Sequence, residues 1–130
     1  MMYIKIKMST LYNILYYSTA RGDIPVREFL NELPEKVRAK ARGFLALLSE
    51  EGPNLPRPYA DAVRGKIREL RIRFGSDNIR ILYYFFLKDN VVLLHALRKQ
   101  TREIPRGDLA LAESRMLDYT ERHQKGEIKL

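Results

Sequence analysis

Hydrophobic residues recur along the chain with two different periods, and these periods predict where its helices and strands lie. Residues 11–17 are mostly aromatic and aliphatic and run into a turn, which predicts a strand. A helix follows, with Asp23 as its expected cap, apolar residues at helical spacing and Pro34 as its end. A second helix over residues 35–51 carries one apolar stripe and stops at Gly52, which a proline follows.

The second half of the chain alternates with the period of β-structure and predicts three more strands. They cover residues 66–74, 79–87 and 91–97. The connections between them hold only three or four residues, too few for a parallel crossover, so the strands form consecutive antiparallel hairpins. Residues 105–123 show helical spacing again and predict a last helix.

The resulting element order, β-α-α-β-β-β-α, predicts an α+β protein. We expect a small twisted antiparallel sheet with the two N-terminal helices packed on one face and a C-terminal helix. The other face should stay partly open, where a ligand could lie. A chain of 130 residues suits a single domain over residues 1–130, of which 1–10 could form an extension.

Composition excludes several classes of chemistry. The chain has no cysteine and only two histidines, so disulfides, thiolate zinc sites and iron–sulfur clusters are excluded, and we expect neither a metal nor a cofactor. The longest apolar run, residues 81–87, is too short to cross a bilayer, and the first ten residues lack the apolar stretch of a secretory signal. We therefore expect a cytoplasmic protein that does not enter a membrane.

The positive charge of the chain is concentrated in one segment. The formal net charge is +8, and residues 57–106 alone carry +7, against +2 before them and −1 after them. Of the 24 cations, 15 are arginine, whose planar guanidinium pairs with phosphate through two hydrogen bonds. This favours a polyanionic partner such as a nucleic acid, with a merely solvated basic surface as the alternative.

Strand periodicity assigns several arginines to the face that we expect to be open. In the first of the three strands, Arg71 and Arg73 lie opposite the apolar set, whereas Arg68 shares the apolar side. In the next strand Arg80 and Tyr84 have the same parity, so we expect Arg80 to join Arg71 and Arg73, with Tyr84 beside them. Such an arrangement suits single-stranded RNA. The RNA-binding candidates are Arg68, Arg71, Arg73, Tyr84 and, at the end of the last strand, Arg98. The other aromatic residues of that strand are more simply explained as core.

The last strand carries His95 and is followed at once by Arg98 and Lys99. A histidine titrates near neutral pH and, beside fixed cations, could serve RNA cleavage without a metal. In that reaction a base removes the proton of the ribose 2′-OH, the oxygen attacks the adjacent phosphorus, and cations stabilise the phosphorane. The alternatives are a hydrogen-bonded core histidine and solvated cations at a strand end.

Three runs of sequence, taken in order, resemble the phage-derived HigB-type branch of the RelE/ParE toxin superfamily. They are IRELR (67–71), IRILYY (79–84) and LLHALRKQT (93–101), with Pro105 and Ala112 behind them. The helix before Pro34 and the long helix after it also look like that branch. The resemblance covers about residues 11–120 and implies a RelE-like fold.

The resemblance implies a toxin of a type II toxin–antitoxin system that cleaves mRNA, often on the translating ribosome. Arg80 and Arg71 match the sheet arginines that contact the scissile phosphate and RNA, Lys99 and Arg98 match a basic pair, and His95 matches a histidine of the branch. Arg80, Lys99 and His95 are thus the catalytic candidates. The implied partners are mRNA, the ribosome and a helix-turn-helix antitoxin, in a dimer or a heterotetramer with that antitoxin.

Two other functions fit the same residues. A ParE-like inhibitor of DNA gyrase would share the fold and cut nothing, because one fold serves both activities. A non-toxic basic module that only binds nucleic acid is the second alternative.

Overall fold

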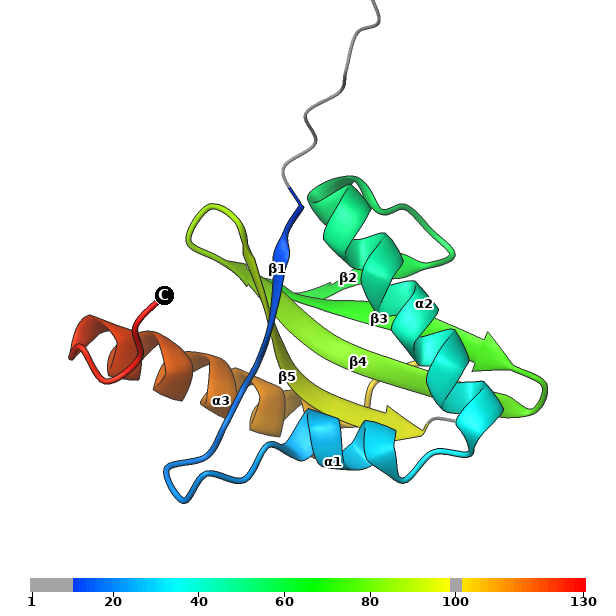
Figure 1. The fold of residues 1–130 in the computed structure, drawn as a ribbon, viewed down its shortest axis with the longest axis horizontal. Coiled ribbons are helices and arrows are strands. Elements are labelled where there is room, and N and C mark those ends of the chain that lie inside the picture. Colours follow the sequence, from blue (N-terminus) through cyan, green and yellow to red (C-terminus); the bar gives the residue numbers. More distant parts are fainter. Residues whose placement is uncertain (1–10, 99–101) are drawn as a thin grey trace, which may run out of the picture.

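The computed structural model describes residues 11–98 and 102–130, which form a five-stranded sheet with helices on both faces (Figure 1). The elements in chain order are β1 (Asn13–Tyr16), α1 (Pro25–Asn31), α2 (Glu35–Glu51), the 3₁₀ helix η1 (Gly52–Asn54), β2 (Ala60–Arg64), β3 (Ile67–Phe74), β4 (Asp77–Phe86), β5 (Asn90–Arg98) and α3 (Arg106–Gln124). The α+β class, the two N-terminal helices on one face and the C-terminal helix are confirmed. No helix of the described part is long and apolar enough to cross a membrane.

The strands lie in the order β1-β5-β4-β3-β2. The antiparallel meander β3–β4–β5 is as predicted, with Arg71 opposite Arg80 and Leu82 opposite His95. The sheet is mixed rather than purely antiparallel, because β1 pairs with β5 in parallel and places Tyr16 opposite Leu93. Short turns join the meander strands, whereas two helices and the strands β2, β3 and β4 lie between β1 and β5 in the chain, so no turn fixes the direction of β1 relative to β5.

Apart from the three-residue η1, strand β2 is the one element among the described residues that the sequence pattern did not predict. It is a five-residue edge strand that pairs with β3 in antiparallel fashion, with Ala60 opposite Leu70. Asp61 and Arg64 interrupt the apolar alternation in so short a segment, and a proline-rich connector precedes it. The position of β2 matters for the site, because the second half of β3 runs past its first residue.

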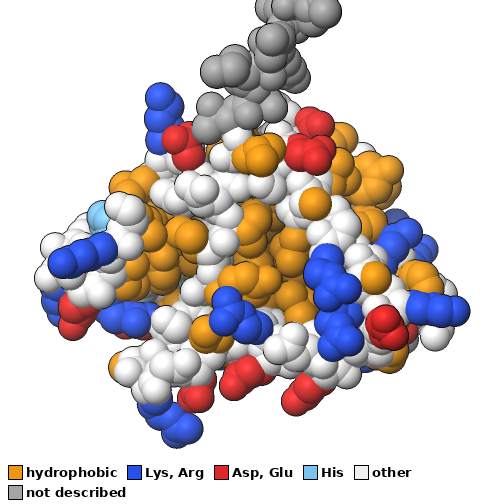
Figure 2. All heavy atoms as spheres, in the orientation of Figure 1, with side chains coloured by type: hydrophobic (Ala, Val, Ile, Leu, Met, Phe, Trp, Pro, Cys, Tyr) orange, Lys and Arg blue, Asp and Glu red, His pale blue; other side chains and the backbone are white. Residues whose placement is uncertain are grey.

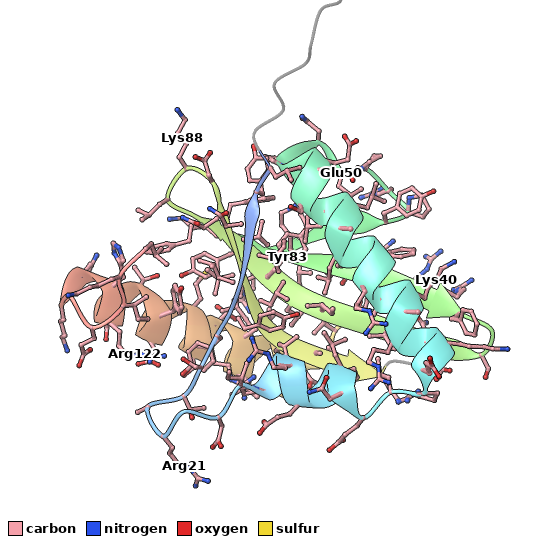
Figure 3. All side chains as sticks on the ribbon, viewed as in Figure 1. Arg21, Lys40, Glu50, Tyr83, Lys88 and Arg122 are labelled. Atoms are coloured by element: carbon pink, nitrogen blue, oxygen red, sulfur yellow. The ribbon has the colours of Figure 1, made fainter. Side chains whose placement is uncertain are left out.

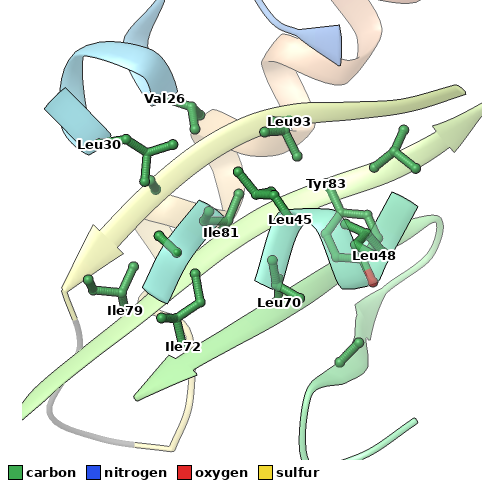
Figure 4. Close-up of a cluster of buried hydrophobic side chains, with 14 of the residues drawn as sticks. Val26, Leu30, Leu45, Leu48, Leu70, Ile72, Ile79, Ile81, Tyr83 and Leu93 are labelled. Atoms are coloured by element: carbon green, nitrogen blue, oxygen red, sulfur yellow. The ribbon is translucent and has the colours of Figure 1, made fainter. Parts of the chain in front are cut away.

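The larger core lies between the sheet and helices α1 and α2. Figure 4 shows Leu45 and Leu48 of α2 beside Leu70 and Tyr83 of the sheet, with Val26 and Leu30 of α1 at the other end of the cluster. Each fully buried aliphatic side chain of this kind contributes about 1.5–3 kcal/mol. Helix α1 begins after Ile24 with no side-chain cap, so the expected capping role of Asp23 is wrong.

The second core lies between the sheet and α3. A β-bulge between Leu82 and Tyr83 of β4 makes Leu94 an extra residue of β5, so that Leu94 and His95 both lie on the α3 side. Tyr17 donates a hydrogen bond of 2.6 Å to Asp118 of α3. Helix α3 therefore covers much of the sheet face that the sequence left partly open. The part of that face bearing Arg71 and Arg80 adjoins a pocket.

Candidate functional site

Arg71 of β3 and Arg80 of β4 face each other directly across the sheet. Two cations at opposite positions repel, and an arrangement of this kind requires compensation. Glu69 supplies it: its Oε1 accepts a hydrogen bond of 2.6 Å from Nε of Arg71 and one of 3.2 Å from Nε of Arg80. Glu69 is only 3% exposed and Arg80 only 7%. One buried carboxylate therefore fixes the orientation of both guanidinium groups.

Further contacts hold Arg80 at the floor of the site. Its Nη1 donates to the side-chain oxygen of Asn78 and, at 3.3 Å, to the carbonyl oxygen of Ile79. Burial lowers the pKa of Arg80 below its usual value; the Glu69 carboxylate opposes that shift and the positive charge of Arg71 adds to it. The group remains a cation at neutral pH, as arginine does in proteins.

Asp61 of β2 extends the network outward. Its Oδ2 lies 3.2 Å from Nη2 of Arg71 and 3.0 Å from Nε of Arg57. Loss of hydration tends to raise the pKa of Asp61, but hydrogen bonds from Arg57 and the Ala62 N–H, and the charges of both arginines, hold it below its usual value. The chain of contacts runs from Arg57 through Asp61 and Arg71 to the buried carboxylate.

Two adjoining pockets open at this network. The first, which we call the arginine pocket, has a volume of about 430 Å³ and is lined by Arg57, Asp61, Arg71, Arg73, Arg80 and Arg102. The second, the side pocket, has a volume of about 340 Å³ and is lined by Lys40, Phe44, Pro58, Tyr59, Arg71, Arg73, Asn78 and Arg80. Six of these residues are cations and one is a carboxylate; with Glu69 included, the formal excess is four positive charges. In Figure 2 lysine and arginine side chains lie beside α2 and also at the opposite, α3 end of this face, whereas apolar side chains lie between α2 and β1. Figure 3 shows Lys40 on the side of α2 away from β1.

The structure brings together three of the predicted site residues and separates two others. Arg71, Arg73 and Arg80 line both pockets. Arg68 lies on the other face of the sheet, opposite Tyr83 of the larger core, as its parity predicts, so it does not take part in this cluster. Tyr84 is misplaced: it is 2% exposed beneath α3, where its hydroxyl lies 3.0 Å from that of Thr120. The alternation correctly gave the parity of Tyr84 but did not show that a helix covers it.

The basic pair after the last strand is only partly described. Arg98 ends β5, is exposed, and pairs with Asp77 at the start of β4. It lines neither pocket. Lys99 lies outside the described residues.

His95 lies on the same face as Arg80 and close to it in the sheet. Because His95 pairs with Leu82 and Arg80 pairs with Leu97, the two are diagonal neighbours, whose Cα atoms are typically about 7–8 Å apart. The Nε2 atom of His95 lies 2.6 Å from Oδ1 of Asp108 in the first turn of α3. Nη1 of Arg115 approaches Nδ1 at 3.4 Å and donates at 2.8 Å to the carbonyl oxygen of Leu94. Since arginine only donates, a neutral His95 would carry its proton on Nε2 and donate it to Asp108.

Several residues of the site were not recognised from the sequence. They are Lys40, Phe44, Arg57, Pro58, Tyr59, Asp61, Glu69, Asn78 and Arg102. Of these residues, Glu69 could have been recognised from the sequence. It has the same strand parity as Arg71 and Arg73 and is the one acidic residue on that side of the strand. Among the described residues, no group of three or more histidine, aspartate or glutamate side chains could hold a metal ion.

The comparison with protein families assigns the chain to a known group. Residues 28–117, more than half of the chain, match the family described as "Phage derived protein Gp49-like (DUF891)", and the chain belongs to that family. The family is RelE-like and known in a toxin–antitoxin context, and the matched part includes α2, the whole sheet except β1, and most of α3. None of the curated proteins compared with the chain matches it.

Proposed function

We propose that this protein is the toxin of a type II toxin–antitoxin system and cleaves mRNA as an endoribonuclease of the RelE/HigB type. The observation that carries the proposal is the way Glu69 holds the opposed Arg71 and Arg80. Their Nε atoms are engaged by Glu69, while none of the described acceptors takes a hydrogen bond from Nη1 of Arg71 or Nη2 of Arg80. Two oriented sets of N–H donors are thus available to the oxygens of one phosphate.

The proposed reaction needs stabilisation of charge more than covalent chemistry from the protein. The 2′-oxygen of a ribose loses its proton and attacks the neighbouring phosphorus, while the 5′-oxygen leaves and takes up a proton. Arg80, fixed and poorly hydrated, is proposed to stabilise the phosphorane, since a fixed donor costs no reorganisation when charge develops. Arg71 and Arg73 are proposed to bind phosphate, and Lys99, which follows β5, is kept as a second catalytic cation.

For His95 we propose a positioning role. Both of its ring nitrogens have partners on α3, and through them it fixes the first turn of that helix against β5. Direct proton transfer by His95 would require it to leave Asp108 or Arg115. Holding α3 in place also determines where the chain that precedes it, including Arg102 of the arginine pocket, can lie.

We include in the proposal the partners implied by the family resemblance, which are mRNA on the ribosome and a helix-turn-helix antitoxin.

The test is inducible expression of the wild type, Arg80→Ala and the control Arg64→Ala in bacteria. Arg64 is an exposed cation of β2 that lines neither pocket.

We expect growth arrest and discrete new 5′ ends on cellular mRNA with the wild type and Arg64→Ala. Arg80→Ala should relieve the arrest, because loss of one oriented donor costs about 2.7–4 kcal/mol of transition-state stabilisation. A fully toxic Arg80→Ala would refute the assigned site. DNA breaks with intact transcripts would instead identify a gyrase inhibitor.

A further inference from the structure

The side pocket joins two walls of different chemistry. One is cationic and polar, formed by Lys40, Arg71, Arg73, Asn78 and Arg80, and is partly shared with the arginine pocket. The other is apolar, formed by Phe44 of α2 and by Pro58 and Tyr59 of the connector before β2. A site that bound only phosphate would have no use for the second wall.

The backbone of Tyr59 is hydrogen-bonded to a residue of the cationic wall. Its carbonyl oxygen accepts a hydrogen bond of 2.8 Å from the N–H of Arg71, and its own N–H donates at 3.0 Å to Pro56. The aromatic ring is therefore held at a set place relative to the arginine that we assign to phosphate binding. This contact exists because β3 continues past the first residue of β2.

The ring of Tyr59 is supported from the side and accessible to a ligand. It meets Phe44 edge to face, with ring centroids 5.8 Å apart, and Lys40 lies 5.6 Å from the centroid of Phe44. Tyr59 is nevertheless 40% exposed and lines the side pocket. Edge contact with Phe44 leaves ring area on Tyr59 for stacking.

We propose that the side pocket binds an unpaired nucleobase, stacked on Tyr59, from the strand whose phosphate lies between Arg71 and Arg80. This inference rests on the proposed function and extends it to how the substrate is chosen. A flat aromatic ligand attached to a phosphate satisfies both walls at once. A base within a duplex is already stacked on its neighbours and cannot enter, so the substrate is single-stranded at this point.

Asn78 supplies a polar group that can interact with the edge of the base. Its side-chain oxygen accepts a hydrogen bond from Arg80, which fixes the orientation of the amide and leaves the NH₂ group as its donor. A donor of this kind pairs with the carbonyl oxygen or ring nitrogen of a base.

The test is equilibrium binding of short fluorescent strands to the full chain. One strand is a 2′-O-methyl RNA of mixed sequence, which lacks the 2′-OH needed for cleavage, and the other has the same sugar–phosphate chain without bases. The variants are Tyr59→Leu, Tyr59→Phe and Tyr16→Leu. Tyr16 is the matched control, because it also lies beside an arginine, Arg27 at 5.0 Å, but outside both pockets.

We expect Tyr59→Leu to weaken binding of the base-containing strand about 5- to 150-fold, the usual effect of losing one stacked base. The base-free strand should bind Tyr59→Leu and the wild type equally, and Tyr59→Phe and Tyr16→Leu should match the wild type on both strands. Unchanged binding of the base-containing strand to Tyr59→Leu would overturn the inference. So would equal weakening on both strands, which would show a structural effect. Wild-type protein that binds neither strand would overturn the proposed function as well.

Discussion

Arg71 and Arg80 lie directly opposite each other on neighbouring strands and donate to the same carboxylate oxygen of Glu69. The buried carboxylate thus stabilises a pair of cations that would otherwise repel each other. A phosphate-binding site needs positive charges held close together, and the repulsion between these charges destabilises the folded state.

Removing this carboxylate should therefore destabilise the protein strongly. We expect Glu69→Ala to lower the free energy of unfolding by about 3–5 kcal/mol, since it leaves a buried guanidinium without its ionic partner. Glu69→Gln should cost less, because the amide oxygen still accepts hydrogen bonds. Urea unfolding measures the difference, with the exposed Glu50 of α2 as the control position (Figure 3). Equal stability of Glu69→Ala and Glu50→Ala would contradict the bridging role.

The salt dependence of RNA binding should identify the phosphate-binding residues. Arg73 is exposed and lines both pockets. If it pairs with a phosphate, Arg73→Ala should reduce the slope of log K against log salt concentration by about 0.7 for a single strand. Arg64→Ala, which removes an exposed cation outside the pockets, should leave the slope unchanged. Identical slopes for wild type and Arg73→Ala would remove Arg73 from the proposed site.

A substitution of Asp108 can show whether His95 has a positioning role or acts as a catalytic base. Asp108→Asn keeps an oxygen acceptor for Nε2 of His95, so a positioning role predicts a loss of RNA cleavage rate of less than about tenfold. A histidine base oriented by a carboxylate would lose about 10⁴-fold on the same change. The pH–rate profile of His95→Gln should also keep the shape of the wild-type profile. A large loss in Asp108→Asn together with a changed profile would make His95 a catalytic residue.

Gly52 and Gly43 provide a matched pair of substitutions around α2. A Cβ at Gly52, whose φ is +54°, would lie 2.3 Å from the ring of Tyr12, and Tyr12 is held by two hydrogen bonds to Ser49. We expect Gly52→Ala to lower the melting temperature and the free energy of unfolding by about 1–3 kcal/mol. Gly43 lies within the helix with nothing near its Cβ position, so Gly43→Ala should stabilise the protein by about 0.4–1 kcal/mol. In thermal and urea unfolding, the change in stability relative to the wild type should have opposite signs for the two variants.

Alkaline pH should destabilise the fold through its buried tyrosines. Burial raises the pKa of Tyr84 above its usual value of 10.0, although the hydrogen bond with Thr120 opposes the shift. Above about pH 10 the unfolded chain loses this proton before the folded chain does, so the free energy of unfolding falls as pH rises. Tyr84→Phe should cost about 1 kcal/mol at neutral pH through the lost hydrogen bond, and this deficit should shrink above pH 10. Urea unfolding at several pH values tests this, and a constant deficit would contradict it.

Local patterns were sufficient to predict the meander and the face on which its arginines lie. Alternation placed Arg71 and Arg80 on one face, but their direct opposition was not predicted, because β4 begins at Asp77 and the turn is shorter than the expected one over residues 75–78. Contacts between distant segments could not be obtained in this way. Nothing near β1 indicates that it runs parallel to β5, and nothing near Tyr84 indicates that α3 covers it.

The apolar wall of the site was missed for a related reason. Tyr59 lies in a proline-rich connector whose local sequence indicates only extended backbone. Its place beside Arg71 depends on the pairing of β2 with β3, and Phe44 reaches it from α2. A site assembled from a helix, a connector and two strands has no compact motif. Only the cationic strand positions were visible in the sequence.

The bulge in β5 means that a single residue decides which layer the end of the sheet faces. Before the bulge, odd-numbered residues such as Leu93 pack toward the N-terminal helices; after it, the even-numbered Ala96 does so. The same sequence without the bulge would alternate simply, turn His95 into the larger core and take Leu97 away from α3. Deleting Leu94 would instead remove the extra residue, so His95 and Leu97 would stay on the α3 side and Ala96 on the side of the larger core. A one-codon deletion at the bulge should therefore preserve inside and outside up to the end of β5, which a deletion in a regularly alternating strand would not.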